Sequence, residues 1–356
     1  MKIRTLIFPL LILAAVAAVG YWLSNRDPEK PEISSKVSEK LVDPELLENI
    51  TEIVLQSIAD DKTVHIKKDD KGTWILPDYY LLPVEFSKLD NFISSLLKAD
   101  ILRFVTRNKN RMERLEFSKH KIVMKATGES IWSMETGKRG QSGGLFVRFN
   151  DEAEAYLADL TSYFDSNVDN WPEKRMLLFQ SSDVTALYFD FPNSEPDFII
   201  KRGTVESKFT AEGLMENEKL DESSITSFIS TLSSARYTKV HDLDDPDAIA
   251  AKDHTHSIKF ELFNGKTYSL HIGRRPADIL DGVENENPDL NDNESEVKEG
   301  LEEPEPGPVF IFFESTDPND RLNSIMQRVS LSYSNYVFNQ VPKSREKFIE
   351  ATPSSP

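Results

Sequence analysis

The chain has 356 residues, of which 39% are hydrophobic and 10% aromatic, and it contains no cysteine. This composition supplies a buried core and excludes a disordered chain, a disulfide-stapled scaffold and a lipoprotein, whose lipid anchor needs a cysteine. The formal net charge of −18 would repel phosphates, which excludes nucleic acid as a partner. The length fits about two domains at ~150 residues each.

An uncharged run of 18 residues occupies positions 6–23 and reads LIFPLLILAAVAAVGYWL. As a helix it would span ~27 Å, close to the hydrocarbon thickness of a thin bilayer. Lys2 and Arg4 precede it. Positive charge favours the cytoplasmic side, so we expect residues 1–5 in the cytoplasm. We therefore predict a single-pass inner-membrane protein whose residues after about 24 lie in the periplasm.

The end of this run carries Tyr21 and Trp22, an interfacial pair that favours an uncleaved anchor. A cleaved secretory signal is the alternative, because the alanines before the pair suit a signal peptidase, and cleavage would release the chain into the periplasm. Residues 24–44 are polar and charged and contain prolines. We expect them to form a linker that holds the folded part away from the membrane.

Strand-type runs and one amphipathic helix follow the linker. The runs are ITEIVLQ (50–56), TVHIKK (63–68), GTWILP (72–77), HKIVMKAT (120–127), IWSMETGKR (131–139) and GLFVRF (144–149). Between the third and fourth runs, Leu89, Phe92, Ile93 and Leu96 recur at the spacing of one helical face. The stretch FISSLLKAD (92–100) therefore predicts a helix packed on a sheet.

The second half of the chain repeats this series. FISTLSSAR (228–236) returns at an offset of 136 from FISSLLKAD, and the strand pair 256–263 and 268–275 keeps that offset. The strands VTALYF and DFIIKR, which begin at 184 and 197, are offset by 134 from their counterparts. PVFIFF (308–313) is offset by 164, because an acidic insertion precedes it. Such a register predicts an internal duplication.

We therefore expect an α+β fold, with an N-terminal transmembrane helix followed by two tandem homologous units. Each unit is predicted to be an antiparallel sheet with one long packed helix, and Asp221 is the predicted N-cap of the second helix. The first unit covers 45–176, the second covers 177–348, and 349–356 form a tail. At the end of each unit, residues 156–175 and 321–345 predict a helix followed by an exit containing proline and basic residues.

The acidic insertion covers residues 277–307 and carries twelve Asp or Glu against one Lys. Like-charge repulsion with few apolar residues predicts a disordered, solvated loop. A calcium loop beginning at Asp289 does not fit, because Glu294 stands at the sixth position, where glycine is needed.

Two basic pairs end equivalent strands of the two units, Lys138 with Arg139 and Arg274 with Arg275. We predict that they contact an anion or a partner. The glycine-rich stretch around the first pair, GKRGQSGG (137–144), lies between two strands and lacks the Gly-Lys-Ser/Thr ending of a phosphate loop. It therefore predicts a flexible hairpin loop.

The histidines are the first candidates for metal ligands. His254 and His256 share one face of a predicted strand, whereas His271 faces the other way on the paired strand. The three cannot converge on one ion, so no metal ligand is predicted. The chain also lacks Gly-x-Ser-x-Gly and His-Glu-x-x-His. We predict a protein without catalytic residues or cofactor.

Several of these features resemble one known family, the domain of unknown function 4340 (DUF4340). They are the N-terminal anchor, the ITEIVL strand, the GTWIL strand, the helix through FISSLLKAD, GLFVRF and the WPEKR exit into a second round. The resemblance covers roughly residues 1–340 and carries no catalytic residue. Members are similar to proteins encoded beside an ABC-type permease and a gliding-motility-like component, which implies an accessory role in the envelope.

The leading functional hypothesis is a non-enzymatic accessory, docking or assembly component with a protein partner in the envelope. It would serve an ABC-type transport or gliding-like system and hold to the membrane through residues 6–23. The first alternative is an extracytoplasmic binding protein for polysaccharide or lipid. The second alternative is an unrecognised hydrolase. The sequence predicts no oligomeric state.

Overall fold

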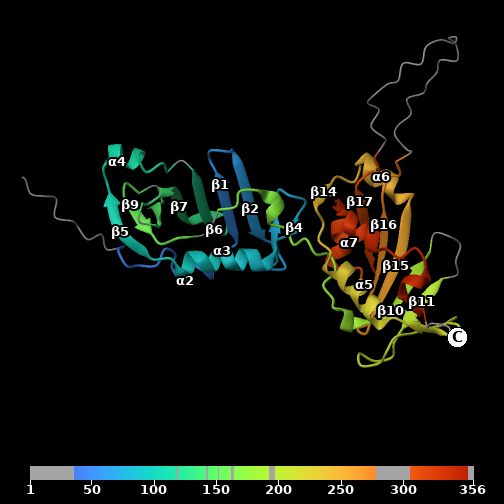
Figure 1. The fold of residues 1–356 in the computed structure, drawn as a ribbon. Coiled ribbons are helices and arrows are strands. Elements are labelled where there is room, and N and C mark those ends of the chain that lie inside the picture. Colours follow the sequence, from blue (N-terminus) through green and yellow to red (C-terminus); the bar gives the residue numbers. More distant parts are fainter. Residues whose placement is uncertain are drawn as a thin grey trace, which may run out of the picture. The chain divides into compact units, whose positions relative to one another are not determined.

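The computed structural model contains two large antiparallel sheets and several short helices (Figure 1). It describes residues 36–351 apart from 118, 142, 151, 162–163, 192–196 and 278–304. No helix in these described residues is long and apolar enough to cross a membrane. The expected anchor at 6–23 and most of the acidic segment lie outside the described residues. The chain divides into two compact parts, residues 1–62 with 91–164, and residues 63–90 with 165–356. Below, the first and the second unit mean the stretches of chain that form the first and the second large sheet.

The first sheet has nine strands in the order β4-β3-β2-β1-β6-β7-β8-β9-β5. Its strands are β1 (Glu52–Ser57), β2 (Lys62–Lys68), β3 (Trp74–Leu76), β4 (Leu82–Pro83), β5 (Ile101–Thr106), β6 (His120–Ala126), β7 (Glu129–Arg139), β8 (Leu145–Phe149) and β9 (Ala155–Ala158). The helices along this part of the chain are α2 (Pro44–Leu47), α3 (Phe86–Lys98) and α4 (Lys109–Glu113).

The second sheet has eight strands in the order β12-β11-β10-β15-β16-β17-β18-β14. Its strands are β10 (Val184–Asp190), β11 (Phe198–Lys201), β12 (Thr210–Ala211), β14 (Lys239–His241), β15 (Thr255–Leu262), β16 (Thr267–Gly273), β17 (Val309–Ser315) and β18 (Ser330–Tyr333). A small sheet pairs β13 (Glu218–Leu220) with β19 (Ile349–Ala351). The helices are α5 (Glu222–Ser234), α6 (Pro246–Lys252), α7 (Arg321–Met326) and α8 (Asn335–Gln340). Short 3₁₀ turns lie at Val168–Asn170, Ser181–Asp183 and Arg345–Phe348.

Eight strands of the first sheet, in the order from β3 to β5, correspond one by one to the eight strands of the second sheet, in the order from β12 to β14. For example, β6 corresponds to β15 and β7 corresponds to β16. Their registers also correspond. In the first sheet Ile122 pairs with Leu55 on one side and with Met134 on the other. In the second, Ile258 pairs with Phe189 and Leu270, which stand at the offsets found in the sequence.

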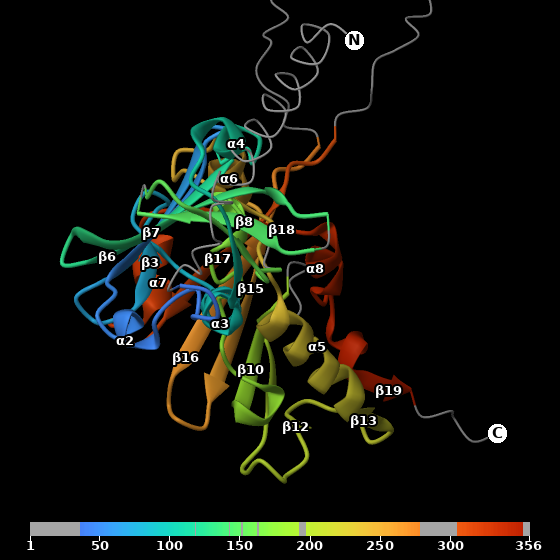
Figure 2. The same cartoon turned by 90° about the vertical axis from the view of Figure 1, so that its left-hand side faces the viewer.

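Each sheet is covered on one face by a helix of 13 residues, α3 or α5. The apolar stripe of α5 buries Ile225, Phe228 and Leu232 against the second sheet, and Figure 2 shows the helix lying beside β10. Asp221 caps α5 by accepting a hydrogen bond from the Ser224 amide, as predicted. The predicted helices through FISSLLKAD and FISTLSSAR are thus confirmed.

The predicted helices at the unit ends need correction. The described part of residues 156–175 contains no α-helix; it opens with the buried strand β9 and later forms the 3₁₀ turn Val168–Asn170. Residues 321–345 contain α7, the strand β18 and α8 rather than one helix. Strand β18 occupies the place of β9, with all four of its residues buried. Fourteen residues separate β17 from β18, whereas five separate β8 from β9, so α7 is an addition to the second sheet.

Candidate functional site

The second sheet has one covered face and one open face. The core beneath α5 contains Phe260, Leu270 and Ile311, one from each of three central strands. Side chains alternate across a sheet, so His271 and Phe312 point to the opposite face. Among the described residues, α6 covers one end of that face by packing on β16 and β17. The remainder of the face offers a surface for binding.

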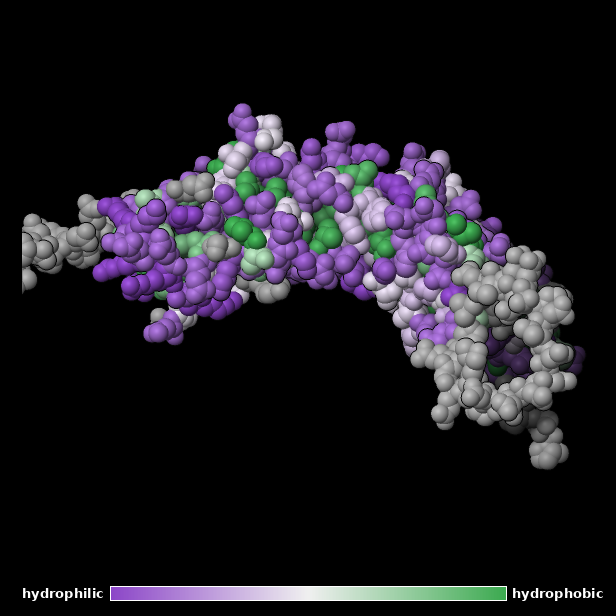
Figure 3. All heavy atoms as spheres, turned by 90° about the horizontal axis from the view of Figure 1, so that it is seen from above, coloured by the Kyte–Doolittle hydropathy of each residue, from purple (hydrophilic) through white to green (hydrophobic). Residues whose placement is uncertain are grey.

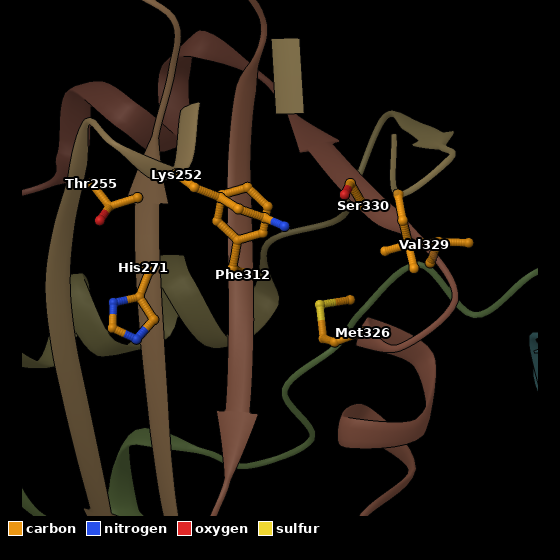
Figure 4. Close-up of a pocket in the computed structure, with 8 residues that line it drawn as sticks. Lys252, Thr255, His271, Phe312, Met326, Val329 and Ser330 are labelled. Carbon is orange, nitrogen blue, oxygen red and sulfur yellow. The ribbon is translucent and has the colours of Figure 1, made fainter. Parts of the chain in front are cut away.

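A hollow of about 360 Å³ lies on this open face. We call it the His271 hollow; its lining consists of Leu243, Lys252, Thr255, His271, Phe312, Met326, Val329 and Ser330. Figure 4 shows Thr255, His271 and Phe312 on neighbouring strands, with Met326, Val329 and Ser330 across the hollow from them.

Strand separation opens this hollow. Strands β17 and β18 pair only at Val309 with Tyr333 and Phe310 with Ser332. Ser330 pairs with β14, whereas Phe312 on β17 pairs only with β16. Met326 ends the added helix α7 and lines the gap between β17 and β18. The site therefore depends on an element that the first sheet does not have.

His271 lies at the centre of the open face. Its Nδ1 is 2.8 Å from the Ser257 hydroxyl, and it also lines a second hollow of about 290 Å³ over β10 and β11. Lys252 places its ammonium group over the Phe312 ring, 5.4 Å from the ring centroid. Such a cation over an aromatic face is stabilised by the ring quadrupole. His271 and Lys252 are thus the nitrogen groups available to a ligand in the hollow.

The equivalent positions of the first unit carry paired charges instead. Glu135 stands where His271 does in the second sheet, and it forms an ion pair with Arg148, which stands in the place of Phe312. Glu116 and Lys119, which correspond to Lys252 and Thr255 at an offset of 136, form a further ion pair at 2.8 Å.

The same backbone framework therefore has two different surfaces. On the first sheet the charged side chains at these positions form ion pairs with each other. On the second sheet the equivalent positions border a hollow that has one cation and apolar walls. Figure 3 shows one face of the molecule on which hydrophilic side chains predominate and apolar ones form small separate patches.

A line of three polar side chains lies beside the hollow. The Nδ1 of His241 lies 2.8 Å from the Asp245 carboxylate, and its Nε2 lies 3.0 Å from the Ser332 hydroxyl. Burial would raise the pKa of Asp245, but hydrogen bonds from His241 and the Ala248 amide outweigh it and lower the pKa. The spacing of His241 and Asp245, four residues apart, was a sequence signal for this contact.

This line resembles a Ser-His-Asp arrangement, but its serine is inaccessible. Ser332 is 4% exposed and lies within a strand that is paired on both sides. Its hydroxyl is 3.5 Å from the Lys239 carbonyl oxygen and 3.4 Å from the Thr238 hydroxyl. A nucleophile needs an open approach for its substrate. The contacts instead tie the start of α6, capped by Asp245, to the edge of the sheet.

The four predicted basic residues lie at the ends of β7 and β16. Lys138 is 3.7 Å from Glu116, and Arg275 forms an ion pair with Asp247 at 2.6 Å. Arg274 lies over the Phe338 ring at 4.7 Å.

Arg139 is exposed at the end of its strand. The two residues of each basic pair are neighbours in the sequence. Two of the four cations are already engaged by carboxylates of this chain, which leaves Arg139 the most available for an outside contact.

The histidines do not form a metal site in the described residues, where no three His, Asp or Glu side chains gather closely enough to hold an ion. His256 packs against Phe338 on the α5 side, and burial lowers its pKa. His120, at the equivalent position, packs against Phe164 and has a pKa lowered by burial too. Both have a buried Nδ1 without a hydrogen-bond partner among the described residues.

Fold and surface together define an α+β protein with two sheets of common strand order and a hollow on one of them. The sequence profile of the domain of unknown function DUF4340 matches residues 74–253, and the chain belongs to this family. The resemblance seen in the sequence is thereby confirmed. No curated protein and no solved structure matches the chain.

Proposed function

We propose that this protein is a non-enzymatic, membrane-anchored envelope component that docks a partner on the open face of its second sheet. In this proposal residues 6–23 anchor the chain in the inner membrane, and the residues after about 24 lie in the periplasm. An ABC-type transport or gliding-like system is the proposed setting. The apolar run and the charges before it support the anchor.

We further propose that the two sheets descend from one duplicated unit. Their common strand order supports this, as does the correspondence of register across the central strands. A second copy can change its surface while the first preserves a stable fold. The proposed division of labour makes the first unit a support and the second unit the binding element.

One observation carries the docking role. At equivalent positions, the first unit has the Glu135–Arg148 ion pair, whereas the second has His271 and Phe312 beside a hollow. Charges that are paired within the chain offer little to a partner, because their hydrogen-bonding capacity is already used. Aromatic side chains and Met are enriched in the cores of interfaces, and Phe312 and Met326 line this hollow.

A site-specific photocrosslinker placed in living cells tests the proposal. We would introduce p-benzoylphenylalanine at Lys259, which is exposed on the open face, and at Val123, its equivalent in the first unit. Position 259 should yield a crosslinked membrane protein, and position 123 should not. No adduct at position 259, or equal adducts at both positions, would contradict the proposed docking face.

Fractionation tests the location separately. The full chain should remain with the inner membrane and be accessible to protease added from the periplasmic side. A shortened chain in the soluble periplasmic fraction would instead support the alternative of a cleaved signal.

The alternative function, binding of a polysaccharide or lipid, is favoured by one specific observation. The His271 hollow has a volume at the lower end of the range of small-molecule sites, which is roughly 300–1,000 Å³. Its apolar walls favour a lipid over a polysaccharide, because sugars require many more polar partners than four side chains provide.

A further inference from the structure

The lining of the His271 hollow is unusual for this chain. Sixty acidic residues against 42 basic ones give the protein a net charge of −18, yet none of the described residues that line the hollow is a carboxylate. Leu243, Met326 and Val329 supply apolar parts of the lining, and Lys252 and His271 supply nitrogen groups. A cavity that is free of acids within an acidic protein favours an anionic guest over a cationic one.

Lys252 is placed to receive such a charge. Among the described residues no carboxylate lies within ion-pair distance of its ammonium group, which lies over the Phe312 ring. The first unit shows the contrasting arrangement, because Lys119 there is neutralised by Glu116 at 2.8 Å. In the second unit Thr255 stands in the place of Lys119, and Lys252 stands in the place of Glu116. The second unit therefore has no carboxylate at these two positions, and the ammonium group of Lys252 can contact a ligand.

We propose that the His271 hollow binds a small amphiphilic anion, an apolar chain that carries one carboxylate or phosphate group. The apolar chain would lie against Leu243, Met326 and Val329. The anionic group would lie near Lys252, with the hydroxyl of Thr255 and the ring of His271 as further hydrogen-bond partners. This inference goes beyond the proposed docking role, because it assigns the hollow a small ligand of its own.

The size of the hollow sets the length of the chain. Its volume of about 360 Å³ equals that of roughly twelve water molecules at ~30 Å³ each. A chain of about ten carbons fills a comparable space, and each methylene that is buried should raise the affinity roughly fourfold. A short anion such as acetate gains nothing from the apolar wall, so affinity should rise with chain length.

Photolabelling of the full chain provides the test. The protein would be placed in nanodiscs of phosphatidylcholine and labelled with a decanoate that carries a diazirine, and the labelled peptides would be mapped by mass spectrometry. Unlabelled decanoate, decyl phosphate, decanol and acetate would compete. Labels in the nanodisc lipid region serve as an internal reference for partitioning.

Two variants separate the two halves of the site. Lys252→Glu should weaken competition by decanoate by about fivefold or more and leave decanol unchanged, since it alters only the charge. Leu243→Gln should weaken both, since it alters the apolar wall. The matched controls are Lys219→Glu, at an exposed position of β13, and Leu178→Gln, whose side chain is 61% exposed. Both controls should behave as the unaltered chain does.

The outcomes are distinct. Labels at residues 243–255 or 312–330, displaced by decanoate or decyl phosphate and not by acetate, support the inference. The better competitor of the two identifies the source as a free carboxylic acid or a phosphate-bearing lipid. Labels confined to other peptides, or a Lys252→Glu variant that retains decanoate competition, would overturn it. The crosslink at position 259 tests docking independently, so either proposal can fail alone.

Discussion

Two glycines hold the same structural place in the two units, and replacing them tests the shared framework. A Cβ at Gly137 would lie 2.2 Å from the Leu115 carbonyl oxygen, and a Cβ at Gly273 would lie 2.5 Å from that of Ala251. In each unit the carbonyl at the end of a short helix approaches the strand too closely for a side chain. We expect Gly137→Ala and Gly273→Ala each to destabilise its own unit.

The expected size follows from the contact. A normal carbon–oxygen separation would need the Leu115 carbonyl to retreat by about 1 Å, and that carbonyl now accepts a hydrogen bond from the Lys138 amide at 2.8 Å. Losing the bond costs about 1 kcal/mol, and overpacking adds about 1–3 kcal/mol. Gly137→Ala should therefore lower the free energy of unfolding of the first unit by about 2–4 kcal/mol.

Hydrogen exchange read by mass spectrometry resolves the two units. Exchange in β6 and β7 of Gly137→Ala should quicken by roughly 30- to 1,000-fold, with β15 and β16 unchanged, and Gly273→Ala should show the reverse. Gly203→Ala is the matched control, because a Cβ there meets nothing within 4 Å. If Gly137→Ala exchanges as slowly as Gly203→Ala, the close carbonyl approach is not a constraint and the reasoning is wrong.

Three further predictions concern the second unit. Burial lowers the pKa of His256 below its ordinary 6.5 in the folded chain, so the unfolded chain binds more protons below about pH 6.5. Stability should therefore fall with acidification, and His256→Asn should reduce that loss between pH 7.5 and 5.5 in urea unfolding. Asp245→Ala should cost about 1–2 kcal/mol and quicken exchange in α6, whereas Asp245→Asn should retain most of the cap. A fluorophosphonate probe should leave Ser332 unlabelled, and an adduct on it would show that the serine is reachable.

Much of the framework could be predicted from the sequence because period and register are local properties. The stripe Phe228, Ile229 and Leu232 identified α5, and Asp221 identified its start. The offset of 136 also anticipated that Ile258 would pair with Leu270 as Ile122 pairs with Met134. Alternation correctly placed His256 and His271 on opposite faces of neighbouring strands.

The unit ends could not be predicted in the same way. Tyr156 and Leu157 belong to a four-residue strand that is buried on both faces, and periodicity does not separate such a run from a helix. The hollow escaped prediction too, because it depends on the separation of β17 from β18 and on α7. A comparison of the halves residue by residue would have shown Glu135 against His271 and Arg148 against Phe312, which is the available signal.

Under the proposed duplication, packing decides where the two copies could diverge. Core positions such as Ile122 and Ile258 stay apolar because they lie beneath a helix, and the glycines stay because a carbonyl occupies the space of a side chain. The open face has neither constraint, so charges there could be exchanged for aromatic and neutral groups at little cost to stability. A binding site that arises by duplication is therefore expected on the uncovered face of one copy, and His271 lies on that face in the second copy.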